Sequence, residues 1–169
     1  MAEMKGSKTE SNLYEAFAGE SQANRKYLAF ADKADAEGQK QVAKLFRAAA
    51  AAETVHAHAH LRTAGGVNTT AENLKEAIAG ETEEFVSMYP KMIEEAISEG
   101  QDAALRSFKF ANDVEKVHAS LYQRAFDNLG NNEDVDYYVC KVCGNTIEGE
   151  PHGPCGVCQA GPVAFFKVD

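Results

Sequence analysis

One segment of this chain occurs twice, and this repeat restricts the possible fold more than any other feature. Glu53–His56 recurs as Glu115–His118, sixty-two residues later, and Ala16–Ser21 recurs as Ala77–Thr82, sixty-one residues later. Two helix pairs related by such a repeat supply two lone glutamates and two Glu-x-x-His motifs. That inventory is the ligand set of a carboxylate-bridged two-metal site inside a four-helix bundle.

Four long helices are expected in the first 130 residues. The first starts at the capping-box pattern Ser7–Glu10 and runs to about residue 37, and the second covers about residues 39–64. The third starts after Thr69 or Thr70 and runs to residue 99, and the fourth covers about residues 101–129. Pro90 lies inside the third helix and should kink it, because proline removes one backbone hydrogen bond.

The two Glu-x-x-His motifs are the predicted centre of the metal site. Glutamate and histidine three residues apart share one helix face, so each motif can offer a carboxylate and an imidazole to the same point. A cluster of buried carboxylates needs cations, and oxygen ligands with imidazole suit iron or manganese. A single Glu-x-x-His more often marks a solvated face, but two copies at equal spacing favour metal. The predicted ligands are Glu20, Glu53, His56, Glu81, Glu115 and His118.

One further acid breaks the symmetry of the repeat. Glu84 lies three residues after Glu81 on the same helix face, whereas the matching position in the first half is Ala23. The site is therefore expected to be asymmetric, with one extra carboxylate ligand; the alternative is an exposed acid. Tyr27 and Tyr89 are candidates to hydrogen-bond ligating carboxylates, and aromatic core residues are the alternative for both.

All four cysteines of the chain lie in its last thirty residues. Cys140 and Cys143 form one Cys-x-x-Cys pair, and Cys155 and Cys158 form a second pair that is separated from the first by eleven residues. Two such turns facing each other make a tetrahedral four-thiolate site for zinc or iron. So short a strand-and-turn unit has too small a core to fold without the metal. Gly144 can adopt the left-handed conformation that turns backbone amides toward the sulfur atoms.

The charge and hydropathy of the chain exclude several classes of partner. The formal net charge is −9 and the isoelectric point is about 5.1, which argues against nucleic acid and anionic membranes. No apolar stretch approaches the ~20 residues of a membrane helix, and the first eight residues lack the apolar core of a secretory signal. A cytoplasmic location is therefore expected.

Taken in order, the motifs resemble those of the rubrerythrin family. The resemblance rests on Ala16–Gln22, Gly80–Glu84, Met88–Pro90, the two Glu-x-x-His motifs and the two cysteine pairs. It implies a mainly α fold, with a ferritin-like four-helix bundle over residues 1–130 and a rubredoxin-like domain over residues 131–169. It also implies two non-haem irons, with an oxo bridge as one form, and one iron held by four cysteines, with zinc as the alternative. By resemblance, the di-iron ligands are Glu20, Glu53, Glu81, Glu84, Glu115 and His118, and His56 exchanges with Glu84 at one iron.

The resemblance also implies an activity, namely reduction of hydrogen peroxide to water in protection against oxidative stress. Electrons would enter through the rubredoxin-like iron from a reduced donor such as a rubredoxin or an NAD(P)H-dependent reductase. Two ferrous ions that each give one electron avoid releasing a hydroxyl radical. One alternative is a ferroxidase or iron-handling protein. Another is a non-catalytic zinc-containing module that binds a partner.

The cysteine turns depart from the family pattern at three positions. Lys141 and Gly156 replace prolines, and Gln159 replaces the glycine after the second pair. Gln159 is expected to strain the second turn or to change one amide-to-sulfur hydrogen bond. The departure bears on the redox potential of this centre and on its choice of iron over zinc.

The connection between the second and third helices predicts a domain-swapped homodimer. Ferritin-like bundles need a long crossover at this point. Only residues 65–70 are available, which reach about 20–25 Å when extended. The required path is on the order of 30 Å at ~1.5 Å per helical residue. The first two helices of one copy should therefore complete a bundle with the last two of another. A misplaced helix boundary is the alternative.

Overall fold

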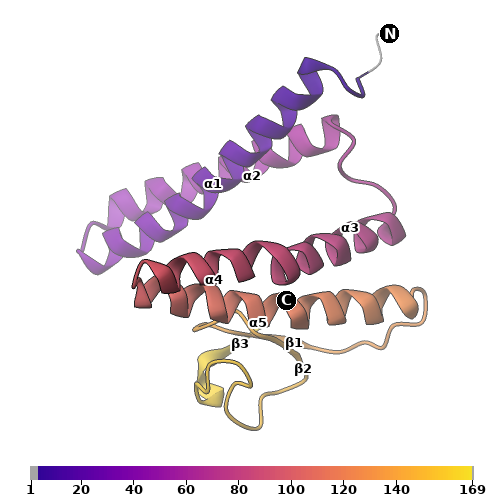
Figure 1. The fold of residues 1–169 in the computed structure, drawn as a ribbon. Coiled ribbons are helices and arrows are strands. Elements are labelled where there is room, and N and C mark those ends of the chain that lie inside the picture. The colour runs from indigo at the N-terminus through magenta and orange to yellow at the C-terminus, as the bar shows by residue number, and fades with distance from the viewer. Residues whose placement is uncertain (1–3, 169) are drawn as a thin grey trace. The chain divides into compact units, whose positions relative to one another are not determined.

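The computed structural model describes residues 4–168 and divides the chain into two compact units. The first unit ends at Asn68 and the second begins at Thr69, so each unit contains one copy of the repeat. This division differs from the predicted domain boundary at residue 130, which separates the helical region from the cysteine unit and stays a prediction. Figure 1 shows the elements of both units.

The first unit is a hairpin of two long helices, α1 (Lys8–Ala36) and α2 (Lys40–Thr63). The predicted cap is confirmed, because the Ser7 hydroxyl accepts a hydrogen bond from the backbone N–H of Glu10 at 3.1 Å. Alanines dominate the seam between the helices, and small side chains let the two backbones approach closely. The buried alanines are Ala31, Ala34, Ala43, Ala50 and Ala57.

The second unit begins with three consecutive helical segments that pack along one long helix (Figure 1). These are α3 (Thr70–Glu83), the π-helical segment η1 (Glu84–Met88) and α4 (Tyr89–Ser98), and the long helix is α5 (Asp102–Asp127). Thr69 caps α3 with a complete capping box in which Glu72 is the reciprocal partner. The predicted ends of all four long helical segments are thus confirmed to within about two residues.

The interruption of the third helix lies before Pro90 rather than at it. In η1 the backbone N–H of Tyr89 donates to the carbonyl of Glu84, five residues back, instead of to Phe85. Pro90 has no N–H and occupies the first turn of α4, where its missing donor costs least. The sequence predicted a kink from the proline. The structure instead places a widened turn immediately upstream, and this turn begins at Glu84.

The chain after α5 forms the predicted strand-and-turn unit. Three short antiparallel strands, β1 (Tyr137–Cys140), β2 (Thr146–Glu148) and β3 (Phe165–Val168), form a sheet in the order β2-β1-β3. A short 3-10 turn, η2 (Pro162–Ala164), leads into β3. The first cysteine is the last residue of β1, so the sheet holds the first cysteine turn at its end.

Over the residues that the structure describes, none of the helices combines the length and the apolar character needed to cross a membrane.

Candidate metal centres

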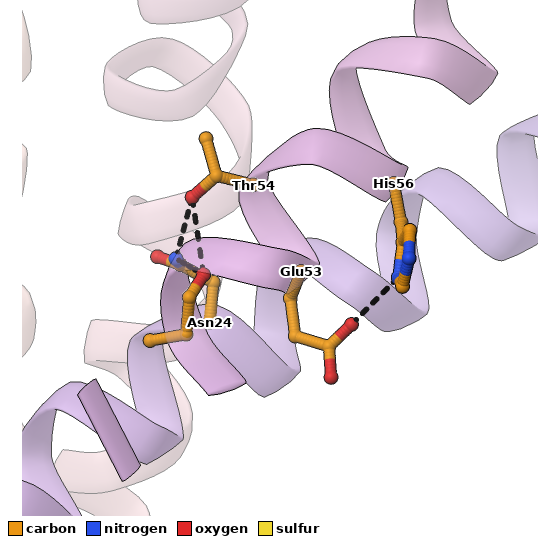
Figure 2. A network of polar contacts seen from close by, with 5 residues as sticks. Asn24, Glu53, Thr54 and His56 are labelled. Carbon is orange, nitrogen blue, oxygen red and sulfur yellow. Dashed lines mark hydrogen bonds and ion pairs between the residues drawn. The ribbon is translucent and has the colours of Figure 1, made fainter. Parts of the chain in front are cut away.

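The first unit brings together one glutamate from α1 and the first Glu-x-x-His motif from α2. One side-chain ligand atom from each of Glu20, Glu53 and His56 lies within 4.8 Å of the others. The Nδ1 atom of His56 lies 3.0 Å from a carboxylate oxygen of Glu53 (Figure 2). Glu53 is half-buried and His56 is exposed, so this half-site has an open side in the chain as described. The ligand roles of these residues remain predictions.

A buried amide sets the register of α1 against α2 beside this half-site. Asn24 lies one helical turn after Glu20 and is 7% exposed. Its side-chain nitrogen donates to the Ala50 carbonyl at 2.7 Å and to the Thr54 hydroxyl at 2.9 Å (Figure 2). Because Thr54 follows Glu53 directly, these bonds fix the height of the motif on α2 relative to Glu20 on α1. Sequence reasoning missed Asn24, although a polar residue one turn after a ligand was an available signal.

The second unit repeats the arrangement with α3 and α5. Ligand atoms of Glu81, Glu115 and His118 again lie within 4.8 Å of one another. The Nδ1 atom of His118 lies 2.8 Å from a Glu115 oxygen and 3.7 Å from a Glu81 oxygen. All three side chains are half-buried. The repeat in the sequence therefore folds into two similar half-sites, one in each unit.

The electrostatics of the second half-site fit a cation. Burial raises the pKa of Glu81, and the negative charge of Glu115 raises it further. Burial, followed by the charges of Glu81 and Glu83, also raises the pKa of Glu84. Carboxylates that resist ionisation in each other's company are stabilised by a positive ion between them.

The π-helical segment of the second unit is held by an amide that mirrors Asn24. The Phe85 carbonyl loses its α-helical donor, because Tyr89 donates to Glu84, and the next donor along the chain would be Pro90, which has none. The side-chain nitrogen of Asn112 fills this gap at 3.0 Å, in the orientation that its surroundings assign. Phe85 and Asn112 match Asn24 and Ala50 in the repeat. The same two positions of the repeat therefore hold each helix pair together. The amide is on the first helix of the pair in the first unit, where Asn24 lies on α1, and on the last helix in the second unit, where Asn112 lies on α5.

Two tyrosines, Tyr89 and Tyr122, lie near the predicted carboxylate ligands, and a third, Tyr27, was predicted to. Burial raises the pKa of Tyr89, and the charges of Glu84 and Glu115 raise it further, so its phenol keeps its proton. Burial and then the charge of Glu81 do the same for Tyr122, which sequence reasoning missed, although it lies one turn after His118. The ring of Tyr27 contacts the aromatic rings of Phe30 and Phe46 in the first unit. Hydrogen bonding of Tyr27 and Tyr89 to ligands stays a prediction.

The four cysteines converge in one cluster, as the two Cys-x-x-Cys pairs predict. The sulfurs of Cys140 and Cys158 are 3.7 Å apart, and those of Cys143 and Cys155 are 3.5 Å apart. These separations are close to the ~3.8 Å edge of a tetrahedron with ~2.3 Å metal–sulfur bonds. Burial raises the pKa of the Cys155 thiol, but backbone N–H groups of Cys158 and Val157 outweigh it and the pKa falls to about 7. The cluster therefore fits a tetrahedral metal ion.

The two cysteine turns have the same backbone geometry. Gly144 donates its N–H to the Cys140 carbonyl at 2.8 Å, and Gln159 donates in the same way to Cys155 at 3.0 Å. Gly144 has φ +84°, as expected for a glycine in the left-handed region. Gln159 has φ +61° and is the one non-glycine residue with positive φ among residues 4–168. The predicted strain of the second turn thus has a structural basis.

Comparison with known proteins agrees with this geometry. A family model described as rubrerythrin matches residues 11–126. Rubrerythrin of Porphyromonas gingivalis is 35% identical over 97% of this chain and 91% of its own length. Rubrerythrin-2 of Clostridium acetobutylicum is 33% identical over 92% of this chain and 94% of its own length. The solved structure of nigerythrin in a mixed-valence state aligns with a TM-score of 0.59 at 32% identity, covering 99% of this chain and 91% of that one.

The fold and the two kinds of centre define a mainly α, ferritin-like di-iron protein with a rubredoxin-like iron unit at its C-terminal end. Glutamate and histidine groups serve the di-iron site, and the four-cysteine cluster serves the rubredoxin-like iron. The chain belongs to the rubrerythrin family. The family and cofactor predictions are thereby confirmed, and at this coarser level the chain is a di-iron oxidative-stress protein of that family.

Proposed function

We propose that this protein is a peroxidase that reduces hydrogen peroxide to water at the di-iron site. Each peroxide accepts two electrons and two protons and yields two water molecules. Two irons held by these glutamates and histidines would supply the two electrons and polarise the peroxide oxygens. The observation that carries the proposal is the presence, in one chain, of two matched half-sites and a four-thiol cluster. The paired half-sites can hold a two-electron centre, and the four-thiol cluster can hold a one-electron centre that returns electrons to it.

The geometry of each half-site supports a proposed role for each residue. Glu53 and Glu115 are proposed as bridging carboxylates, because each lies beside the histidine of its own motif. Histidines can bind only one metal each and are proposed as terminal ligands. Glu84 is proposed as the extra ligand on one side, since it follows Glu81 by three residues and starts the π-helical segment. The full proposed ligand set is Glu20, Glu53, His56, Glu81, Glu84, Glu115 and His118.

The surrounding groups can supply protons. Tyr89 and Tyr122 keep their phenol protons, because burial and the nearby carboxylates raise the pKa of both. The raised pKa of Glu84 lets its carboxyl carry a proton whenever it is not bound to metal. Peroxide reduction consumes two protons, so groups that hold a proton beside the site serve the reaction.

We further propose that the two half-sites meet between two copies of the chain. The connector between α2 and α3 is six residues long, Ala64–Thr69, as the predicted helix boundaries required. It reaches about 20–25 Å. The stretches from Glu53 to Thr63 and from Thr70 to Glu81 together span about 30 Å along a bundle at ~1.5 Å per residue. Large apolar side chains such as Leu45 and Val86 are 67% and 63% exposed, and a swapped partner could cover them.

Stopped-flow mixing of the fully reduced, iron-loaded protein with hydrogen peroxide tests the proposed activity. The visible absorption of the ferric tetrathiolate reports the cysteine centre. Rapid peroxide loss, followed by oxidation of this centre, is expected. Glu115→Gln is the matched control, because it removes one proposed bridge and leaves all four cysteines in place. It should retain the tetrathiolate iron and lose the fast reaction.

The same experiment separates the rival functions. A wild-type protein that binds three irons but does not consume peroxide is not a peroxidase. Rapid oxidation of added ferrous iron by oxygen, without peroxide turnover, would identify a ferroxidase. A colourless protein carrying zinc in the cysteine cluster, with no redox activity, would identify a binding module.

A further inference from the structure

The cysteine unit touches the second half-site through one hydrogen bond. The Nε2 atom of His118 on α5 lies 3.0 Å from the hydroxyl oxygen of Thr146 on β2. The same hydroxyl donates to the Gly144 carbonyl at 3.3 Å, and Gly144 directly follows Cys143. Thr146 is half-buried and borders a cavity of about 340 Å³, lined mainly by apolar side chains, that also reaches His118. One threonine therefore contacts both a proposed iron ligand and the first cysteine turn.

This contact is one of two that align β2 with α5. Thr146 contacts His118, and Glu148 pairs with Arg124 at 2.8 Å. Residues two apart on a strand share one face, so Thr146 and Glu148 both face α5. The six residues from His118 to Arg124 advance about 9 Å along the helix, and the two residues from Thr146 to Glu148 advance about 7 Å along the strand. The contacts are therefore in register, and the position of Thr146 opposite His118 is built into the docking.

The contact with Thr146 orients the ring of His118. A histidine that binds a metal ion through Nδ1 carries its hydrogen on Nε2. The Thr146 oxygen can accept that hydrogen at 3.0 Å while its own hydrogen points to the Gly144 carbonyl. The Nδ1 atom faces Glu115 and Glu81 and is the nitrogen available to a metal ion there. A histidine ligand is usually oriented by a bond from its other nitrogen, and here a neighbouring domain supplies the acceptor.

We propose that Thr146 is a positioning residue that holds the ring of His118 through its Nε2 atom and keeps its Nδ1 atom aimed at the bound iron. The consequence is that the di-iron site depends on the docked cysteine unit of the same chain. This inference rests on the proposed role of His118 as an iron ligand. It adds a residue outside the helical bundle to the determinants of iron binding.

Iron affinity measured by chelator competition on the full-length, metal-loaded protein tests this role. Thr146→Val keeps the shape of the side chain but cannot accept the bond, and it should weaken iron binding at the bundle site by about 10–100-fold. Thr146→Ser retains the hydroxyl and should restore affinity to within a few-fold of wild type. Glu148→Gln is the matched control, because it removes a docking ion pair on the same face of β2 and leaves His118 untouched.

The outcomes distinguish positioning from simple docking. Weak iron binding by Thr146→Val alone, with unchanged tetrathiolate absorption and helix content, supports the proposal. Equal iron affinity in Thr146→Val and wild type would overturn it. An equal loss in Thr146→Val and Glu148→Gln would also overturn it, because docking alone would then explain the effect. Peroxide turnover is not part of this readout, so failure of the proposed peroxidase activity leaves the affinity test intact.

Discussion

Replacing Gln159 by glycine should stabilise the cysteine unit. Gln159 occupies in the second turn the place of Gly144 in the first, with φ +61° and the same backbone hydrogen bond. A side chain in the left-handed region costs about 1–2 kcal/mol. Glycine gives back ~0.4–1 kcal/mol through greater freedom in the unfolded chain. The side chain of Gln159 is exposed and makes only a 3.5 Å contact with the Gly156 carbonyl. The net gain is therefore about 0.5–1 kcal/mol.

Guanidinium unfolding of the iron-loaded protein, followed by the visible absorption of the tetrathiolate, measures this gain. For a slope of ~2 kcal/mol per molar denaturant, the midpoint should rise by about 0.2–0.5 M in Gln159→Gly. Gln159→Asn should lie between wild type and glycine, because asparagine tolerates this region better than glutamine. Gly144→Ala should move the midpoint in the opposite direction. A Cβ atom at Gly144 would meet nothing nearer than Val114 at 3.9 Å, so its effect reports backbone strain.

One pattern of results would refute the reasoning. If Gly144→Ala lowers the midpoint while Gln159→Gly leaves it unchanged or lowers it, the left-handed residue of the second turn carries no strain. The departure of this chain at position 159 would then have no energetic consequence. A rise in both variants would show that the midpoint does not report backbone conformation in these turns.

Three other predictions concern the helices. Asn112→Leu should lower the free energy of unfolding by about 1 kcal/mol and speed hydrogen exchange at the Tyr89 amide, because the Phe85 carbonyl loses its donor. Asn24→Leu is the control, and it should cost a similar amount without changing exchange at Tyr89. Equal exchange at Tyr89 in both variants would contradict this. In the metal-free protein the raised pKa of Glu81 means that its carboxyl holds a proton more tightly in the folded chain than in the unfolded chain. The protonated carboxyl therefore contributes its full stabilisation of the fold below pH 4.5, and this stabilisation is lost as the pH rises through the raised pKa. The melting temperature should therefore fall over that interval, and Glu81→Gln should flatten the fall; a rising melting temperature that Glu81→Gln leaves unchanged would disprove it. Inserting about twenty glycine and serine residues between Gly66 and Thr69 should let one chain close its own bundle, because the longer connector spans the required ~30 Å; a persistent dimer by light scattering would count against domain swapping.

Local signals in the sequence predicted most of the secondary structure correctly. The caps at Ser7 and Thr69 and the turn at Gly144 were all readable, because each depends on residues within a few positions along the chain. The clustering of the four cysteines was likewise predicted from their spacing. The π-helical segment was not predicted, because a widened turn has no simple sequence pattern. Its stability depends on Asn112, which lies on a different helix from Phe85.

By itself, the sequence determined the inventory of ligands: two glutamate-histidine motifs, their partner glutamates and four paired cysteines. It could do so because helix periodicity and turn geometry place residues of known spacing on one face. Only the tertiary structure decided which nitrogen of His118 faces Glu81 and Glu115 and which residue contacts its other nitrogen. That residue is Thr146, 28 residues away on another element, and contacts over such separations follow from packing rather than from local pattern.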